Sequence, residues 1–455
     1  MNHRAYLALA IPLTISTMTT PLLGAVDTAV VGQLPDPAYI GGVAVGTLIF
    51  NTLYWVFGFL RVSTSAFAAQ ANGASDPVQG VLALSRPFLL AVIVGICFIL
   101  LQWPIEYGAL LLISPDSDVS RFAAEYFRIR IWGAPFTLMN YVILGWLMGM
   151  AKIKESLFLQ VLMNVLNMIL AILFVHVFSF AVKGVAAAAL IAEVTAFVLG
   201  LVIVLKASGF EWKIPSIQEL IDIQSMKKMF NVNKDLFIRT ICLLVVINMF
   251  TAKGASFGTT FLAANAVLFQ IHYIMAYFFE GLANASSILV GKAVGSNDKD
   301  LYKKTLTLSK QWSVITAFLI ACIYGLFQEQ IIGLFTNLPN VIDLSIEYGT
   351  WLIIYPFAAC FGLVIYGVFT GATEIAPVRN SMFYAMIVYI IIQITATPIW
   401  HNHGLWLAFI IYTIGRSGFL IMYTPRLNKQ LFHLVHGDRS HASPLKDHED
   451  SPASQ

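Results

Sequence analysis

Twelve long apolar stretches run through this chain, and they limit its possible folds more than any other feature. They cover approximately residues 5–33, 40–70, 82–112, 119–150, 156–178 and 183–206 in the first half. In the second half they cover 229–255, 261–292, 306–332, 342–371, 379–400 and 403–425. A bilayer core of about 30 Å is spanned by roughly 20 apolar residues in a helix. We therefore expect an all-α polytopic membrane protein with twelve transmembrane helices.

The composition supports this class and excludes others. Hydrophobic residues make up 58% and charged residues 11% of the chain, against roughly 45–50% and about 25% in soluble domains. This number of charged residues is too small to cover a surface that faces water. We therefore expect most of the protein surface to face the lipid bilayer. The net charge of +3 gives no nucleic-acid-binding patch. The four cysteines lie far apart in apolar stretches without metal-ligand spacing, and we expect no metal site.

Lysine and arginine predict the orientation in the membrane. If both termini and the even-numbered loops share one side, that side carries eighteen Lys and Arg residues. The other side carries three, which are Arg121, Lys183 and Lys253. Positive residues gather on the cytoplasmic side of a membrane protein. We expect a multi-pass protein of the cell (inner or plasma) membrane with both termini in the cytoplasm.

An internal repeat divides the chain into two halves. Moving the second half back by 222 residues superposes several polar and glycine landmarks in order. The matches include Gly32 with Gly254, 71–76 with 293–298, Glu125 with Glu347, and 145–149 with 367–371. Each half has six predicted spans, so both copies enter the membrane in the same direction. Parallel repeats of this kind form two bundles that move against each other, which is typical of transporters.

The repeat gives the predicted domain organisation. We expect an N-terminal six-helix lobe at 1–207, a cytoplasmic linker at 208–228, a C-terminal six-helix lobe at 229–425 and a polar cytoplasmic tail at 426–455. The tail contains His433, His436, His441 and His448. Their irregular spacing favours a solvated tail over a metal site.

Asp27 is the sharpest functional candidate. It lies in the first apolar stretch, downstream of Pro12 and Pro21, each of which removes a helix hydrogen bond and is expected to bend the helix. An ionisable group inside a membrane is costly and by default indicates function. Burial disfavours the charged form of a carboxylate, so this group can exchange a proton for a cation. The alternative is a carboxylate held by an Asn or Arg for packing alone.

Other polar side chains in the predicted spans form a second tier of candidates. Asn164 and Asn167 share one helix face and could hydrogen-bond Asp27, or could serve interhelical packing. Asn140 and Tyr141 have a similar position one span earlier.

Two further acids have equally open interpretations. Glu193 is either a second proton site or the partner of Arg128 or Arg130. Glu280 is either a protonatable site or a carboxylate held by Arg239 or Lys292. The remaining candidates are Met18 and Met168, whose flexible side chains suit a pocket for variable ligands, although ordinary apolar lining is the alternative. Arg61, Arg239 and Arg416 lie nearer the cytoplasmic ends of their spans and are expected to extend toward the membrane surface.

The chain carries no motif for nucleotide hydrolysis or for metal-assisted or serine hydrolysis. We therefore expect no enzyme, no catalytic residue and no cofactor, and we expect an ion gradient rather than ATP to supply energy.

Several of these motifs resemble the multidrug and toxin extrusion (MATE) transporters, most closely their DinF-like branch. The resemblance rests on Pro12, Pro21 and 27–32 in the first span, on 73–76 and 295–298, and on 145–149 and 367–371. It covers residues 4–425. It implies two six-helix lobes in an outward-opening V, and export of cationic amphiphilic compounds against inward H⁺ or Na⁺. It also implies that Asp27 couples ion and substrate, that Asn167 is the family's fifth-span Asn, and that Pro12 is its first-span kink.

This sequence departs from the family at its cation ligands. Ala171 stands where the family often has Asp, and Ala189 stands where it has Thr. The acids that Na⁺-coupled members carry in spans 7 and 10 are also missing. Sodium needs several oxygen ligands, so H⁺ is the expected coupling ion and Na⁺ is less favoured.

The predicted function is a proton-coupled antiporter that exports cationic amphiphilic drugs and toxic compounds as a monomer. The alternatives are a Na⁺-coupled drug antiporter and a flippase for a lipid-linked precursor, whose cavity would need several Arg or Lys for phosphate. A receptor or channel is a further alternative, against which the internal duplication argues.

Overall fold

The computed structural model describes the backbone of residues 2–32, 37–207 and 216–437, and all their side chains except 19–29, 31–32, 37, 207, 217 and 432–437. Within this part of the chain every regular element is a helix. The first half contains α1 His3–Gly32, α2 Pro37–Phe57, α3 Phe59–Ala74, α4 Pro77–Leu100, α5 Gln102–Ile113, α6 Ser117–Arg130, the 3₁₀ turn η1 Ile131–Gly133, α7 Ala134–Gly149, α8 Ile153–Ile172, the π turn η2 Leu173–Val177 and α9 Ala181–Ala207. The second half contains α10 Ile217–Leu220, α11 Ile223–Ala255, α12 Thr259–Gly295, α13 Lys299–Leu326, α14 Gln328–Gly333, α15 Pro339–Gly371 and α16 Ala376–Gly437.

The helices confirm the predicted polytopic class. Ten of them in the described residues are long and apolar enough to cross a membrane. One of the ten is α16, whose backbone leaves helical geometry at His401 (φ 47°, ψ −124°), so it contains two of the predicted spans. The helix α1 supplies the remaining span and continues through Pro12 and Pro21 without ending at either. The predicted ranges 40–70 and 119–150 are each divided by a break, at Gly58 and at 131–133.

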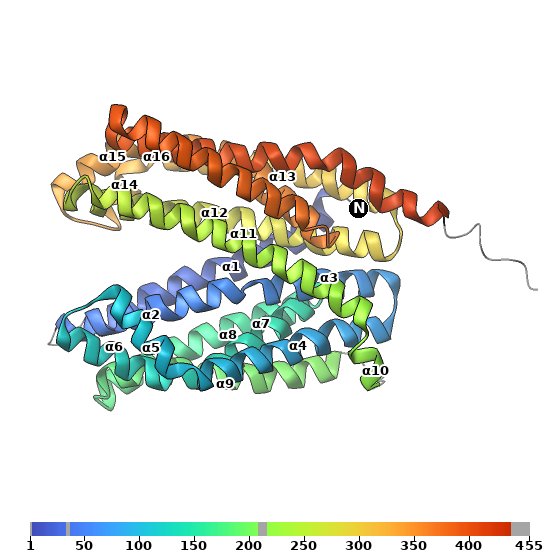
Figure 1. Ribbon diagram of the computed structural model, residues 1–455, viewed down its shortest axis with the longest axis horizontal. Helices are drawn as coiled ribbons and strands as arrows, with labels where there is room; N and C mark the ends of the chain where they lie inside the picture. Colours follow the sequence, from blue (N-terminus) through green and yellow to red (C-terminus); the bar gives the residue numbers. More distant parts are fainter. Residues whose placement is uncertain (1, 33–36, 208–215, 438–455) are drawn as a thin grey trace, which may run out of the picture.

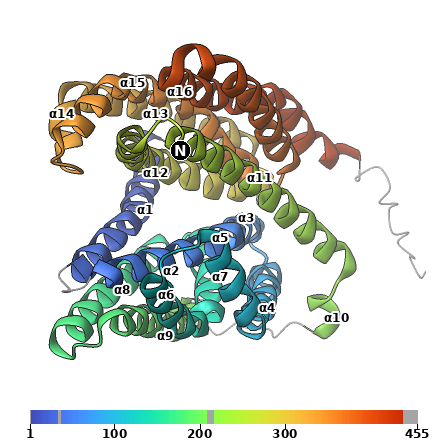
Figure 2. The same cartoon turned by 60° about the vertical axis from the view of Figure 1, so that its left-hand side comes forward.

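Two helical bundles make up the molecule, each with its own apolar core (Figure 1). Helices α2 to α9 form one bundle and α11 to α16 the other. The helix α1 lies between them and packs on α8 of the first bundle and on α12 of the second, as Figure 2 shows. The Tyr6 hydroxyl lies 2.9 Å from Ser286 Oγ, and Thr17 Oγ1 donates to the Tyr277 carbonyl at 3.1 Å. The first helix therefore contacts both halves.

The internal repeat is visible in how the helices pack. In each bundle two glycines bring one helix against the backbone carbonyls of its neighbour, where a Cβ would collide. The contacts are Gly145 with Arg61, Gly149 with Ser65, Gly367 with Ala283 and Gly371 with Ser287. The last two contacts repeat the first two at an offset of 222 in both partners. The repeated glycines are thus used for close α3–α7 and α12–α15 packing.

The same offset relates the turns that follow α3 and α12. Ser75 and Asn297 both have a φ of 53°, in the left-handed region. The next helix begins in each case at an aspartate cap: Asp76 accepts from Gln79 N at 3.0 Å, and Asp298 accepts from Leu301 N at 2.8 Å. An acceptor at this position satisfies a backbone N–H that has no partner inside the helix. The repeated 73–76 and 295–298 motifs are therefore structural turns.

Parts of the predicted linker and tail lie outside the described residues. These are 208–215 and 438–455 of the backbone, with His441 and His448 in the second range. The side chains of His433 and His436 also lie outside the described set.

Candidate functional site

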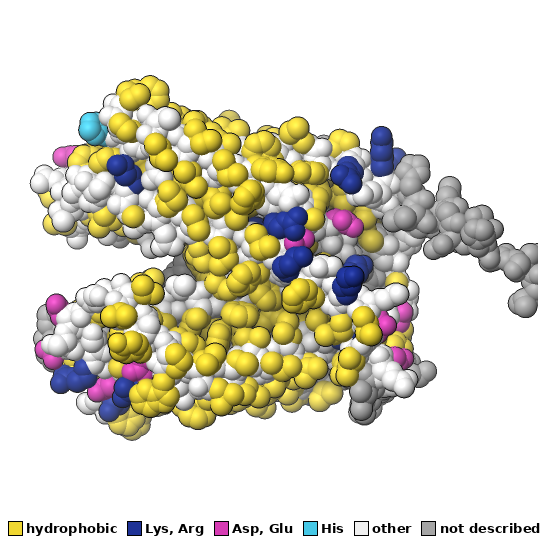
Figure 3. All heavy atoms as spheres, in the orientation of Figure 1, with side chains coloured by type: hydrophobic (Ala, Val, Ile, Leu, Met, Phe, Trp, Pro, Cys, Tyr) yellow, Lys and Arg dark blue, Asp and Glu magenta, His cyan; other side chains and the backbone are white. Residues whose placement is uncertain are grey.

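The two bundles are joined at one end and separated by a cleft at the other, as the space-filling view in Figure 3 shows. The start of α1 and the end of α16 both lie at the joined end (Figure 1). The cleft therefore opens at the end away from them. A site between the bundles is reached from that end in this conformation.

Two glycines on opposite bundles hold the joined end together. A Cβ on Gly73 of α3 would collide with the Lys292 carbonyl, and a Cβ on Gly295 of α12 would collide with the Gln70 carbonyl. Residues 70 and 73 correspond to 292 and 295 at the offset of 222, so each bundle makes the same contact with the other. Gln70 Nε2 also donates to the Gly371 carbonyl at 2.9 Å. The pseudo-two-fold axis therefore runs between α3 and α12.

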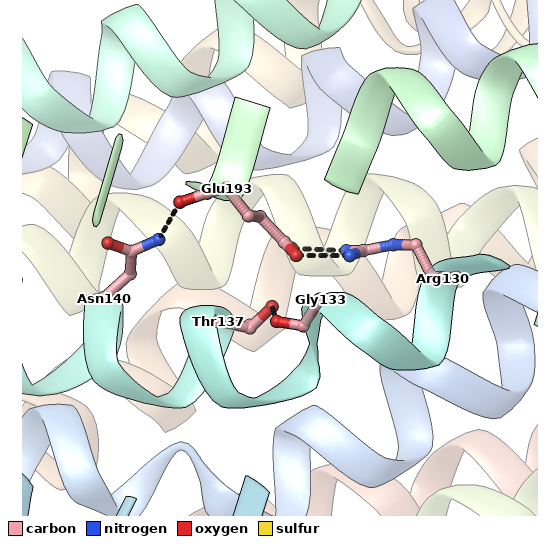
Figure 4. Close-up of polar contacts among 5 residues, drawn as sticks. All are labelled: Arg130, Gly133, Thr137, Asn140 and Glu193. Carbon is pink, nitrogen blue, oxygen red and sulfur yellow. Dashed lines mark hydrogen bonds and ion pairs between the residues drawn. The ribbon is translucent and has the colours of Figure 1, made fainter. Parts of the chain in front are cut away.

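Arginines neutralise the buried carboxylates of the first bundle. Glu193 of α9 accepts two hydrogen bonds from the Arg130 guanidinium (Figure 4). Glu106 of α5 accepts from Arg128 Nε at 3.1 Å and Nη2 at 2.8 Å. Of the two interpretations of Glu193, the structure supports the ion pair, and it selects Arg130 as the partner. A bidentate pair of this kind leaves no lone charge for a transported cation.

Replacing Glu193 by glutamine is expected to lower stability by about 3–5 kcal/mol, because the Arg130 charge then stays buried without its partner. Both side chains are about one-tenth exposed, at 9% and 11%. The measurement is thermal unfolding of the purified protein. Glu125→Gln is the matched control, since its contact with Lys183 is 4.0 Å long and more exposed, and we expect a loss of about 1 kcal/mol or less. Equal shifts for the two variants would contradict a structural role for Glu193.

Three predicted asparagines are buried in the first bundle. Asn164 and Asn167 of α8 are 3% and 6% exposed, and α8 packs on both α1 and α9. The Asn167 Oδ1 atom has no hydrogen-bond partner. Asn140 of α7 donates from Nδ2 to the Glu193 carbonyl at 2.9 Å (Figure 4), and its Oδ1 is also unpaired. Asn140 thus belongs to the Arg130–Glu193 cluster, whereas the α8 pair lies on a helix that adjoins α1.

The remaining first-bundle candidates occupy varied positions. The side chains of Asp27 and Pro21 lie outside the described set, although the α1 backbone passes through both. Tyr141, Met18 and Met168 are half-buried.

Glu280 is an exposed side chain on α12. It has no ion pair within 4 Å among the described side chains, so neither Lys292 nor Arg239 holds it in direct contact. The charged groups that act on it electrostatically are Arg61 of α3 and Arg239 of α11. The sequence reasoning missed Arg61, which belongs to the other bundle. The internal repeat could have indicated that Arg61 lies near Glu280. At the offset of 222, Arg61 of α3 corresponds to Ala283 of α12, which is one helical turn from Glu280.

Comparisons with known proteins agree with this architecture. A model of the MatE family matches residues 12–173 and 237–398, one match in each half. DNA damage-inducible protein F of Escherichia coli (strain K12) is 34% identical over 416 residues, which cover 91% of this chain and 90% of that protein. Multidrug resistance protein MdtK of Yersinia pseudotuberculosis serotype O:1b (strain IP 31758) is 20% identical over 445 residues, which cover 94% and 96% of the two chains.

A solved structure shares the fold over nearly the whole length. It is the outward-facing conformation of a multidrug resistance MATE family transporter of the MOP superfamily, with a TM-score of 0.83 and 18% sequence identity. The superposition covers 94% of this chain and 96% of that one. With both halves matched by the family model, and a relative of 34% identity along nine-tenths of the chain, this protein belongs to the MatE family of multidrug efflux transporters.

Proposed function

We propose that this protein is a proton-coupled antiporter that exports cationic amphiphilic compounds, and that proton and substrate compete for the carboxylate of Asp27. The observation that carries the proposal is the pairing of the other acids. The two buried carboxylates described in the first bundle, Glu106 and Glu193, are each held by an arginine through two hydrogen bonds. Glu125, the further acid in these spans, lies 4.0 Å from Lys183, so Asp27 is the one acid in the predicted spans of that half for which no basic partner is described.

The proposed cycle follows from linkage between two ligands of one group. Deprotonated Asp27 attracts a cation that enters from the cytoplasm or the inner leaflet. A proton arriving through the cleft then displaces the cation, since one carboxylate does not hold both. If bound substrate lowers the proton affinity by some factor, then a bound proton lowers the substrate affinity by the same factor. Asn164 and Asn167 are placed on the helix beside α1 and would tune this carboxylate.

The lysine and arginine distribution supports the direction of export. The excess of these residues assigns both termini to the cytoplasm. The start of α1 and the end of α16 lie at the joined end (Figure 1), so the cleft would open to the outside. Substrate released into the cleft would then leave the cell across the plasma membrane.

Two observations favour protons over sodium, and drugs over lipid-linked phosphates. Ala171 and Ala189 are buried methyl groups, at 0% and 4% exposure, where a sodium site of the family type would need oxygen ligands. Of the first-half arginines that could serve a phosphate, Arg61, Arg128 and Arg130, the last two are committed to carboxylates, which leaves Arg61 alone.

The coupling ion is tested with purified protein in liposomes loaded with a fluorescent organic cation. We expect a proton gradient alone to drive the antiport of the dye, because Asp27 exchanges a proton for substrate. A sodium gradient at equal pH on both sides should drive no antiport. Antiport that follows sodium and ignores the proton gradient would contradict the proposal.

A further inference from the structure

A pocket of about 350 Å³ lies at the joined end, where the first turns of α11 reach the first bundle (Figure 1). It is lined by α3 and α4 of the first bundle and by α11 and α12 of the second. Gln70 and Gly295, which make the contacts between the bundles at this end, are among the lining residues. Because the cleft opens at the other end, this pocket is separate from the proposed path of the substrate.

The charged side chains that line this pocket, among the described residues, are both cations. Arg86 of α4 donates from Nε to the Leu220 carbonyl at 3.2 Å and from Nη2 to the Glu219 carbonyl at 2.6 Å. Both acceptors are neutral carbonyls, so they do not cancel the charge of the guanidinium. The Lys228 ammonium of α11 lies 5.8 Å from the centre of the Phe67 ring, which carries no charge either. The pocket is therefore positive.

The acids that act on these two cations lie outside the pocket lining. Asp222 acts electrostatically on Arg86, and Glu374 acts on Lys228. Asp222 accepts a hydrogen bond from Ser225 N at 2.8 Å as the cap of α11. Neither acid forms an ion pair within 4 Å with the two cations in the part of the chain that the structure describes. A pocket of this charge repels organic cations and attracts anions.

The pocket lies where the exposed surface changes from polar to apolar. On α4, Gln79 precedes Arg86 and is exposed and polar, whereas the exposed side chains of 89–100 are apolar. On α11, Lys228 lies two residues before Phe230, which is 66% exposed. A membrane-spanning helix changes in this way at the boundary between the lipid headgroups and the hydrocarbon. The two cations are therefore at the level of the headgroups.

We propose that this pocket binds the headgroup of an anionic phospholipid from the leaflet that meets the joined end. In the orientation proposed above, this is the cytoplasmic leaflet. The phosphate would lie near Arg86 and Lys228, and the glycerol would pack on apolar lining residues such as Leu82 and Met229. Basic pockets between membrane-spanning helices on the cytoplasmic side bind anionic headgroups. A volume of about 350 Å³ falls within the roughly 300–1,000 Å³ of small-molecule sites.

The first test is thermal unfolding of the purified protein in a non-ionic detergent with added short-chain lipid. Dioctanoyl phosphatidylglycerol is compared with dioctanoyl phosphatidylcholine, which has the same chains but no net charge, and with glycerol phosphate, which has no chains. We expect only phosphatidylglycerol to raise the unfolding temperature saturably, by about 3 °C, because a ligand that binds the folded state stabilises it by mass action.

The other outcomes of this test contradict the proposal in different ways. An equal shift with phosphatidylcholine would mean that the charge of the headgroup is not recognised. An equal shift with glycerol phosphate would assign the pocket to a soluble phosphate compound. Unfolding temperatures that do not change with any of the three compounds would overturn the site.

Two neighbouring lysines separate a site from general attraction of charge. Lys228→Gln removes a charge that lines the pocket, while Lys227→Gln removes the same charge from an exposed residue outside the lining. We expect the phosphatidylglycerol concentration at half-saturation to rise about fivefold in Lys228→Gln, which is the contribution of one basic residue near a membrane surface. It should stay within about twofold in Lys227→Gln. Equal weakening in the two variants would overturn the assignment.

A third variant closes the pocket without changing its charge. Ala74 is an exposed residue of the pocket lining, so Ala74→Trp places a large ring in the pocket and keeps both cations. We expect the shift with phosphatidylglycerol to fall to about 1 °C or less. A full shift in this variant would place the lipid elsewhere.

A direct measurement on the wild-type protein does not depend on how well the variants fold. The protein is released from nanodiscs of equal phosphatidylglycerol and phosphatidylcholine content, and the retained lipid is identified by native mass spectrometry. We expect at least about fivefold more bound phosphatidylglycerol than phosphatidylcholine, and equal retention would contradict the site. Because none of these readouts involves drug or proton transport, failure here and failure of the proposed antiport are separate results.

Discussion

Efflux of a fluorescent organic cation from liposomes is expected to fall more than about 100-fold when Asp27 is replaced by asparagine. The amide has nearly the same shape as the carboxylate but carries neither a proton to exchange nor a charge to attract a cation. Two opposite charges about 4 Å apart interact by roughly 4 kcal/mol at an effective dielectric constant of about 20, and each 1.4 kcal/mol is about a factor of ten. The initial rate of efflux under a proton gradient measures the loss.

The control for this variant is Asp343→Asn. Asp343 is an exposed residue of α15, so the same chemical change is made where no transport role is proposed. We expect its efflux rate to stay within about twofold of the wild type, since surface changes are usually small in effect. Wild-type efflux by the Asp27 variant would mean that another group couples the proton.

Replacing Gly295 by valine is expected to stop transport while the protein stays folded. The Gly295 Cα faces the Gln70 backbone carbonyl of the opposite bundle, and a backbone obstacle cannot rotate away as a side chain can. The joined end would then be held apart, and the conformation described here would lose this contact between the bundles. Gly73→Val should act in the same way through Lys292, because the contact repeats about the pseudo-two-fold axis. We expect efflux to fall more than about tenfold in either variant.

The conformational cause can be separated from a folding defect. Spin labels at Gln79 of α4 and Lys303 of α13, both exposed, report the separation of the bundles at the joined end. Their distance by pulsed electron paramagnetic resonance should lengthen by several ångströms in Gly295→Val. The matched control is Gly418→Val, where nothing lies within 4 Å of an added Cβ. An unchanged label distance together with lost efflux would contradict this account of the joined end.

The sequence predicted the fold well because its signals are long and repeated. The twelve apolar stretches and the repeat at an offset of 222 can be recognised without knowing how the helices pack. Asp76 and Asp298, which align at this offset, are equivalent helix caps in the structure. The turn at His401 was also predicted, since it falls between the expected spans 379–400 and 403–425. The interruptions at Gly58 and at 131–133 were not predicted, because both fall inside continuous apolar stretches.

The candidate site could be predicted only in part, because the partners of its ion pairs lie on different helices and the packing of those helices decides which residues meet. Arg128 and Arg130 lie two residues apart on α6 and point in different directions, so the sequence did not reveal which one meets Glu193. The effect of Arg61 on Glu280 depends on how the two bundles face each other. The coupling role of Asp27 stays a prediction.

The most direct test of the central claim is equilibrium binding of a fluorescent cation to the purified protein at about pH 6 and about pH 8, with and without sodium. If one carboxylate holds either a proton or the cation, binding should weaken at the lower pH, ignore sodium, and be lost in Asp27→Asn. Binding that is indifferent to pH and to Asp27, but responds to sodium, would contradict the proton–substrate competition and move the coupling site to the C-terminal bundle.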